Sequence, residues 1–196
     1  MITFTNLFFR SPWPGLIVWS ALFVSDYVLT LSCARLYRAG VSDKIAFEGS
    51  YELNPYFQKD IDSLTKVSPR FVAALLVTAG YLIGVWWLTM VSQPALYQFA
   101  LGALILSQLA VHIRHVRNAF LFRAIAATDA VRGRIEYSRP LTLRVSSVEF
   151  LGFAGAFAVL TVFTQNWFTL GGAIACLAMA WKHRRLASKY AAAKPS

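Results

Sequence analysis

The sequence predicts an all-α membrane protein, a bundle of about five transmembrane helices with short interfacial helices on its cytoplasmic side. The chain has 196 residues, of which 57% are hydrophobic and only 14% are charged, whereas a soluble domain is usually about a quarter charged. The hydrophobic residues gather in long blocks, and windows of about 20 residues with few charges are typical of membrane-spanning helices. The basic residues lie between these blocks in an alternating pattern.

Five apolar blocks define the expected spans, at residues 14–34, 70–92, 94–113, 146–165 and 166–181. The last block is the shortest, about 24 Å long at a rise of ~1.5 Å per residue. We therefore expect its helix to continue into the basic tail, whose long side chains can reach the membrane surface. A proline stands at or just before the start of several blocks, at Pro12, Pro69 and Pro94, where its missing N–H is tolerated.

The basic residues predict the orientation of the bundle. All of the 19 Lys and Arg residues except Arg10 fall between the first and second spans, between the third and fourth spans, or in the tail. Five spans place those segments on one side of the membrane, and the positive-inside rule makes that side cytoplasmic. The N-terminus is then outside and the C-terminus inside a cytoplasmic or inner membrane. Residues 1–190 form a single transmembrane domain in this interpretation, and 191–196 form a disordered tail.

The same distribution of charge bears on the expected partners. The sequence pI is near 10, but the basic residues stand at helix ends, where topology and anionic lipids of the cytoplasmic face explain them. No nucleic-acid partner is therefore expected. Glycine and alanine on the faces of the last two spans would permit a homo-oligomer. Cys33 and Cys176 lie in different spans and predict no disulfide.

The first long connection contains an unusual polar and aromatic stretch, FEGSYELNPYF at residues 47–57. Asn54 and Pro55 fit the cap and first residue of a short helix that continues to about Lys66. This explanation leaves Glu48 and Glu52 without a role. In the second long connection, residues 116–131 either extend the third span or lie along the membrane surface.

Polar residues within the spans are the main functional signal. Asp26 lies in the first span, where an unpaired acid costs at least about 2.5 kcal/mol at the bilayer centre. Its simplest role is a hydrogen bond to a Ser, Thr or Tyr of a neighbouring helix, and the alternatives are a ligand, a proton carrier or a catalytic acid. Glu149 begins the fourth span and is either an interfacial carboxylate near a helix N-terminus or a group pressed against a neighbour at Gly152 and Gly155.

The third span ends in a polar stripe. Side chains spaced four, three and three residues apart share one face of a helix, and here they are Gln108, His112, His115 and Asn118. Two histidines three residues apart can bind one metal ion, although a stripe that meets lipid headgroups explains them equally well. The third histidine, His183, stands among basic residues of the tail, and we expect it to be solvated.

These signals predict a polar site near the cytoplasmic face if the loop at 47–57 folds back into the bundle. A set of oxygen and imidazole ligands then suggests one divalent ion, Zn, Mn or Fe, bound by Asp26, Glu52, Asn54, His112 and His115, with Glu149 as a further candidate. Glu52 would act as the catalytic base on water, together with Asp26. The chain has no HExxH motif and no other familiar signature of membrane enzymes.

Three classes of function remain from the sequence. The first is a metal-dependent intramembrane hydrolase or lipid-modifying enzyme that uses the predicted site. The second is a small transporter or channel for protons or metal ions, with Asp26 as the acid within the membrane. The third is a non-catalytic membrane protein that assembles or binds a partner.

Overall fold

The computed structural model describes residues 8–50, 52–128 and 131–192. Helices make up most of it: α2 (Pro12–Arg38), α3 (Pro55–Asp62), α4 (Pro69–Thr89), α5 (Pro94–Ala127), α6 (Arg139–Thr164) and α7 (Trp167–Ala192), with a 3-10 turn η1 (Val41–Asp43). Two short strands, β1 (Ile45–Phe47) and β2 (Ile135–Tyr137), pair with each other. Helices α2 and α4 begin at prolines as expected. Ser11 and Ser68 cap these helix starts, because their side chains accept backbone N–H groups.

Four helices, α2, α4, α5 and α6, are long and apolar enough to cross a membrane, which indicates a multi-pass membrane protein. The expected fifth span corresponds to α7, which continues into the basic tail as the sequence suggests. Its charged second half keeps α7 outside the group of candidate spans, so its crossing stays a prediction. Ala191 and Ala192 belong to the last turn of α7, and 193–196 lie outside the described residues.

Helices α5 and α6 extend well beyond the apolar blocks that predicted them. The third block ends near residue 113, but α5 continues to Ala127 and carries the polar stripe into the region beyond the block. The fourth block begins near residue 146, but α6 begins at Arg139, where Ser138 provides the cap. Glu149 therefore lies three turns into α6, and its expected role at a helix N-terminus is wrong.

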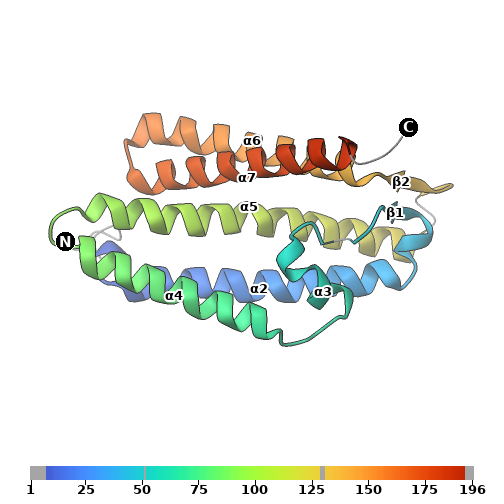
Figure 1. Ribbon diagram of the computed structural model, residues 1–196, viewed down its shortest axis with the longest axis horizontal. Helices are drawn as coiled ribbons and strands as arrows, with labels where there is room; N and C mark the ends of the chain where they lie inside the picture. The colour runs from blue at the N-terminus through green and yellow to red at the C-terminus, as the bar shows by residue number, and fades with distance from the viewer. Residues whose placement is uncertain (1–7, 51, 129–130, 193–196) are drawn as a thin grey trace.

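Helix α5 lies at the centre of the bundle, with α2 and α4 on one flank and α6 and α7 on the other (Figure 1). Helices α5 and α7 approach so closely that a Cβ on Gly102 would clash with the carbonyl oxygen of Phe168. A Cβ on Gly171 would likewise clash with backbone of α5. By contrast, Gly152 and Gly155 of α6 have nothing within 4 Å of an added Cβ. The close helix contact predicted beside Glu149 is thus wrong for these glycines, which lie on an open face.

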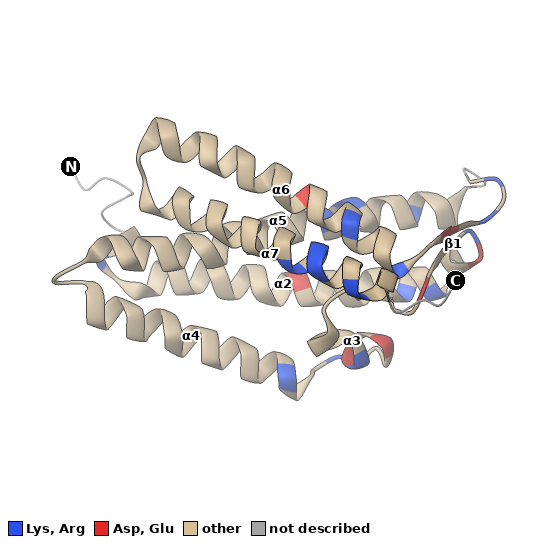
Figure 2. Cartoon of the chain, turned by 45° about the horizontal axis from the view of Figure 1, so that its top comes forward, with Lys and Arg blue, Asp and Glu red and all other residues tan. Residues whose placement is uncertain are grey.

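The strands form a small parallel sheet that an all-α prediction does not contain. Ile45 pairs with Ile135 and Phe47 pairs with Tyr137. The sheet joins the two long connections at one end of the bundle, and Figure 2 shows most of the Lys and Arg residues gathered at that end. We call this end, which holds α3, β1, β2 and the last turns of α7, the basic end. Its cytoplasmic location stays a prediction.

The opposite part of the bundle, which we call the apolar half, is filled with side chains from α2, α4 and α5. Its buried core consists of Trp19, Leu82, Tyr97, Leu101 and Ile105. Leu82 and Leu101 have 0% exposure, and the hydroxyl of Tyr97 donates to the carbonyl of Pro12 at 3.4 Å. The space between these helices is therefore closed.

Candidate functional site

At the basic end, the helices surround a cavity of about 350 Å³. Residues of α2, α3, α4, α5, α6, α7 and the loop before α3 line it. Its chemistry is divided. Aromatic side chains form an apolar wall, namely Phe23, Tyr27, Phe57 and Phe71, and polar side chains also line the cavity, namely Asp26, Glu52, Gln108, Arg114, His115, Arg117, Asn118, Ser146, Glu149 and His183. The cavity is therefore suited to an amphiphilic molecule.

The cavity brings together several residues predicted from sequence. Asp26, Glu52, Asn54, His115 and Glu149 all line it, although they come from four separate segments of the chain. The expected return of the 47–57 loop into the bundle accounts for this convergence. Phe47, at the start of the loop, also lines the cavity.

Asp26 has a histidine as its partner, rather than the Ser, Thr or Tyr that the sequence suggested most simply. The Nδ1 atom of His115 lies 2.8 Å from Oδ1 of Asp26 and 2.9 Å from Oγ1 of Thr30. Thr30, one turn after Asp26, also donates its hydroxyl to the Asp26 carbonyl at 2.9 Å. The carbonyl of His115 lies 3.6 Å from the sulfur of Cys33. These contacts fix the imidazole between α2 and α5.

The partners of His115 also define its tautomer. An ionised Asp26 can only accept hydrogen bonds, and Thr30 has already donated its single proton to a carbonyl. The hydrogen of a neutral His115 therefore belongs on Nδ1, which leaves the lone pair on Nε2. A histidine held in this way by a carboxylate can act as a general base or a metal ligand through Nε2.

Glu52 reaches the cavity from the loop before α3. Its Oε1 accepts the backbone N–H of Asn54 at 2.6 Å, and its own N–H donates to Ser50 at 3.1 Å. Burial raises the pKa of Glu52, while the Asn54 N–H and the nearby His115 oppose the change. The carboxyl group is therefore able to keep its proton at a higher pH than a solvated glutamate does, which suits a general acid.

Arg139, the first residue of α6, holds this loop in place. Its guanidinium donates to the carbonyls of Ser50, Glu52 and Leu53 at 2.9, 3.3 and 3.4 Å. Its backbone N–H donates to the carboxylate of Glu48 at 2.9 Å. Arg139 is buried, with 8% exposure, so these carbonyls replace the water that would otherwise solvate its charge. Sequence patterns do not reveal this role, because the loop and Arg139 are far apart in the chain.

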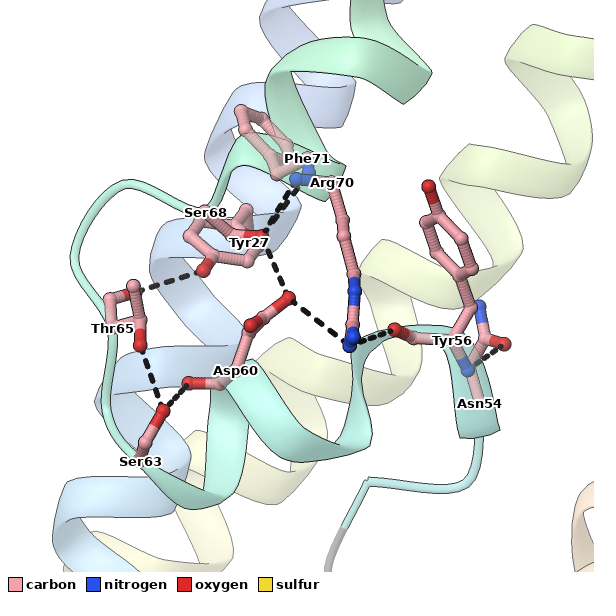
Figure 3. Close-up of polar contacts among 9 residues, drawn as sticks. All are labelled: Tyr27, Asn54, Tyr56, Asp60, Ser63, Thr65, Ser68, Arg70 and Phe71. Carbon is pink, nitrogen blue, oxygen red and sulfur yellow. Dashed lines mark hydrogen bonds and ion pairs between the residues drawn. The ribbon is translucent and has the colours of Figure 1, made fainter.

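The loop is also fastened through α3 to the start of α4 (Figure 3). Ser68 donates its hydroxyl to Asp60 at 2.7 Å while it caps α4. The hydroxyl of Tyr27 donates to the carbonyl of Thr65 at 2.8 Å. Arg70 lies 3.9 Å from Asp60 and donates to the carbonyl of Tyr56 at 3.3 Å. These contacts hold α3 against the wall of the cavity.

Arginines of α5 provide the positive charge of the cavity. Arg114 Nε lies 2.7 Å from Oε2 of Glu149, and its guanidinium stands over the ring of Phe150 at 5.0 Å. Arg117 forms an ion pair with the other oxygen of Glu149 and donates to Asn118 at 3.0 Å. Glu149 therefore joins α6 to α5 through both arginines.

His183 is not solvated, contrary to expectation. It is buried, and its Nδ1 lies 2.8 Å from the hydroxyl of Ser146. Its ring meets Phe150 edge-on, with centroids 5.6 Å apart. Next to it, Ser147 donates to the carbonyl of Ala180 at 2.8 Å. The expectation of a solvated His183 came from its basic neighbours in sequence. In the structure, α7 places this side chain against α6.

The predicted metal ligands do not all converge. His112 is not among the residues that line the cavity, and its buried Nδ1 has no hydrogen-bond partner within the described chain. At about 100° per residue, the direction of Gln108 on the helix surface lies between those of His112 and His115. The two histidines therefore stand at different edges of the stripe. The side-chain oxygen of Asn54 accepts the N–H of Tyr56 as a helix cap at 3.3 Å. Among the described residues, no group of three or more His, Cys, Asp or Glu side chains could hold a metal ion.

The four long apolar helices indicate a multi-pass membrane protein, and a cavity lined by apolar and polar side chains lies at one end of its helix bundle. Comparison of the chain with protein-family models, curated proteins and solved structures found no match. The function must therefore be argued from the cavity.

Proposed function

We propose that the protein is a membrane enzyme that hydrolyses a lipid-like substrate in the cavity at the basic end. The arrangement that carries this proposal is the His115 imidazole, held by Asp26 and Thr30, beside the buried carboxyl group of Glu52. General acid and base groups with different environments in one cavity are typical of hydrolytic sites. The aromatic wall supports a substrate with an apolar part.

The proposed reaction uses both groups. Nε2 of His115 takes a proton from water, and the resulting hydroxide attacks the substrate ester. Asp26 stabilises the imidazolium that forms. Glu52 gives its proton to the leaving oxygen, so the products are an acid and an alcohol, and the proton on His115 then returns to Glu52 through solvent. This mechanism keeps the predicted catalytic residues Asp26 and Glu52 but makes Glu52 the acid rather than the base.

The test is incorporation of oxygen from labelled water. Purified protein in vesicles of mixed ester and phosphoester lipids is incubated in H₂¹⁸O, and the products are analysed by mass spectrometry. We expect a labelled product whose rate falls by about 10²–10⁴ in His115→Gln, which keeps a hydrogen-bond donor for Asp26. His112→Ala, on the same helix but off the cavity, is the matched control. Absence of a labelled product, or an equal rate in His115→Gln, rejects the proposal and favours a non-catalytic role.

Metal-assisted hydrolysis by Zn, Mn or Fe stays a prediction for the same cavity. His115 and Glu52 line the cavity and are ligand types that such an ion accepts, but no group of three or more His, Cys, Asp or Glu side chains among the described residues could hold one. Elemental analysis of the purified protein separates the two mechanisms. A stoichiometric metal that disappears in His115→Gln but not in His112→Ala supports the metal, and its absence supports the metal-free base.

Transport of protons or metal ions has less support. Asp26 and His115 would suit a proton carrier, but the apolar half closes the space between α2, α4 and α5 beyond Asp26. A channel would require a water-filled path past the side chains of Trp19 and Leu101, which are only 2% and 0% exposed. Flux of protons into vesicles that is lost in Asp26→Asn would favour this second function over hydrolysis.

A further inference from the structure

The polar side of the cavity contains an excess of donors over acceptors near Arg114. Arg114 is mostly buried and Arg117 is half exposed, with side-chain exposures of 14% and 56%. Both arginines share the single carboxylate of Glu149. Each guanidinium has five N–H donors, and the three side chains together carry a net positive charge. An anionic ligand would complete this group without displacing Glu149.

Gln108 provides an independent sign of a missing ligand. It lines the same cavity one and a half turns before Arg114, and its buried Nε2 has no hydrogen-bond partner in the described part of the chain. Burial of a donor without a partner is unfavourable, because the group loses its hydrogen bonds to water. An oxygen atom of a ligand in the cavity would satisfy this amide.

The aromatic wall of the cavity is suited to an acyl chain. The rings of Phe23 and Phe71 stack with centroids 4.9 Å apart, and Tyr27 stacks on Phe71 at 4.4 Å. Phe23 belongs to α2 and Phe71 to α4, both candidate membrane spans. These rings therefore offer an apolar surface to an acyl chain on two of the helices expected in the bilayer. The cavity volume of about 350 Å³ fits a headgroup and the first part of a chain, with the rest in the bilayer.

We infer that the cavity binds a lipid with a phosphate-bearing, anionic headgroup, with the phosphate at Arg114 and Arg117 and an acyl chain along Phe23 and Phe71. Arginine is well suited to phosphate because its planar fork donates two parallel hydrogen bonds. Anionic lipids also gather at the membrane face where basic residues are concentrated. As an assignment of the substrate, this inference rests on the proposed hydrolysis, but lipid binding itself does not.

Native mass spectrometry of the purified protein tests the inference. Phosphatidic acid and phosphatidylcholine with identical acyl chains are titrated in parallel. We expect at least about tenfold tighter binding of phosphatidic acid, because one charge-assisted hydrogen bond contributes about 1.5–3 kcal/mol. Arg117→Gln should lose most of this preference. Arg123→Gln removes the same charge from an exposed residue of α5 that is outside the cavity lining and should keep it.

A second variant guards against misfolding. Arg114→Gln alone would leave Glu149 with a weaker partner, so Arg114→Gln is combined with Glu149→Gln, which preserves the net charge. We expect this double variant to lose the preference for phosphatidic acid as well. Equal binding of both lipids to the wild type, or an unchanged preference in both cavity variants, overturns the inference.

Free glycerol 3-phosphate distinguishes a lipid from a soluble phosphate. If the acyl chain matters, glycerol 3-phosphate should compete at least about a hundredfold less well, since burial of a few methylene groups contributes ~0.8 kcal/mol each. Equal competition would overturn the assignment of a lipid. The variant His115→Gln should bind phosphatidic acid like the wild type even though it is inactive. Retained binding with no hydrolysis in the wild type would leave the lipid site in place and reject only the proposed reaction.

Discussion

The apolar half of the bundle and the basic end differ in what fills the space between the same helices. Around Leu101, the core side chains of α2, α4 and α5 are buried. Around His115, further along α5, the helices surround the cavity lined by aromatic and polar side chains. Helices α2 and α5 therefore have two roles, one in each part of the bundle. One part holds the helices together, and the other part presents Asp26 and His115 in a fixed geometry.

The largest effect is expected from a substitution that separates α5 and α7. Gly102→Ala places a Cβ against backbone of α7, which cannot move without shifting the helix. We expect loss of the folded protein or a strong fall in thermal stability in detergent. Gly155→Ala is the matched control, because nothing lies within 4 Å of its Cβ. There, alanine should be neutral or stabilise the helix by up to about 1 kcal/mol. Equal effects of the two substitutions would contradict the close α5–α7 contact.

A core substitution in the apolar half should affect stability and leave the chemistry of the basic end unchanged. Leu101→Ala removes a fully buried side chain, and such changes cost about 2–5 kcal/mol. Thermal unfolding should therefore shift strongly while hydrolysis by the remaining folded protein stays near the wild-type rate. His115→Gln should give the reverse result. A parallel loss of stability and activity in both variants would show that the two regions are not separable.

The connection between Arg139 and the Glu52 loop should be visible in backbone dynamics. Arg139→Lys keeps the charge but cannot reach the carbonyls of Ser50, Glu52 and Leu53 together. We expect faster hydrogen exchange at residues 48–54 and a fall in activity of about tenfold, with exchange in the apolar half unchanged. Arg144→Lys, also on α6 but outside the cavity lining, is the control. Unchanged exchange in the loop would show that Arg139 does not position Glu52.

The smallest expected effect is a dependence of stability on pH at Glu52. Burial raises the pKa of this group in the folded protein above its unfolded value. Ionisation therefore costs stability as the pH rises above the unfolded pKa, while below that value the group is protonated in both states. Glu52→Gln removes this cost and keeps the acceptor for Asn54. The variant should gain stability relative to the wild type as the pH rises, although it loses activity. A constant difference at all pH values would contradict the raised pKa.

Much of the framework follows from local patterns in the sequence. The apolar blocks predicted α2, α4, α5 and α6, because each is long and apolar and has at most two charged residues over a membrane-sized window. The start of α3 at Asn54 and Pro55 was predicted correctly, since helix caps depend on adjacent residues. The helix of the fifth block was also predicted to continue into the tail, as α7 does. The small sheet was missed, because three-residue strands carry little periodicity and their pairing joins distant segments.

The candidate site was only partly predictable. Asp26, Glu52 and His115, which the sequence predicts for one site, line the same cavity, and their role there stays a prediction. His112 was included because its spacing fits a helical stripe, but a stripe does not reveal which edge faces a neighbour. Arg139 and the buried His183 were missed, because their roles depend on partners about 90 and 37 residues away in sequence.

By itself, the sequence determined the helical class, the multi-pass character and the concentration of basic residues outside the apolar blocks, since hydropathy and charge act through local composition. Only the tertiary structure decided three contacts. Asp26 pairs with His115, Arg139 donates to the backbone of the Glu52 loop, and Glu149 joins two arginines. The physical reason is that a buried polar group must find its partner in space, and helix packing brings that partner from a distant part of the chain.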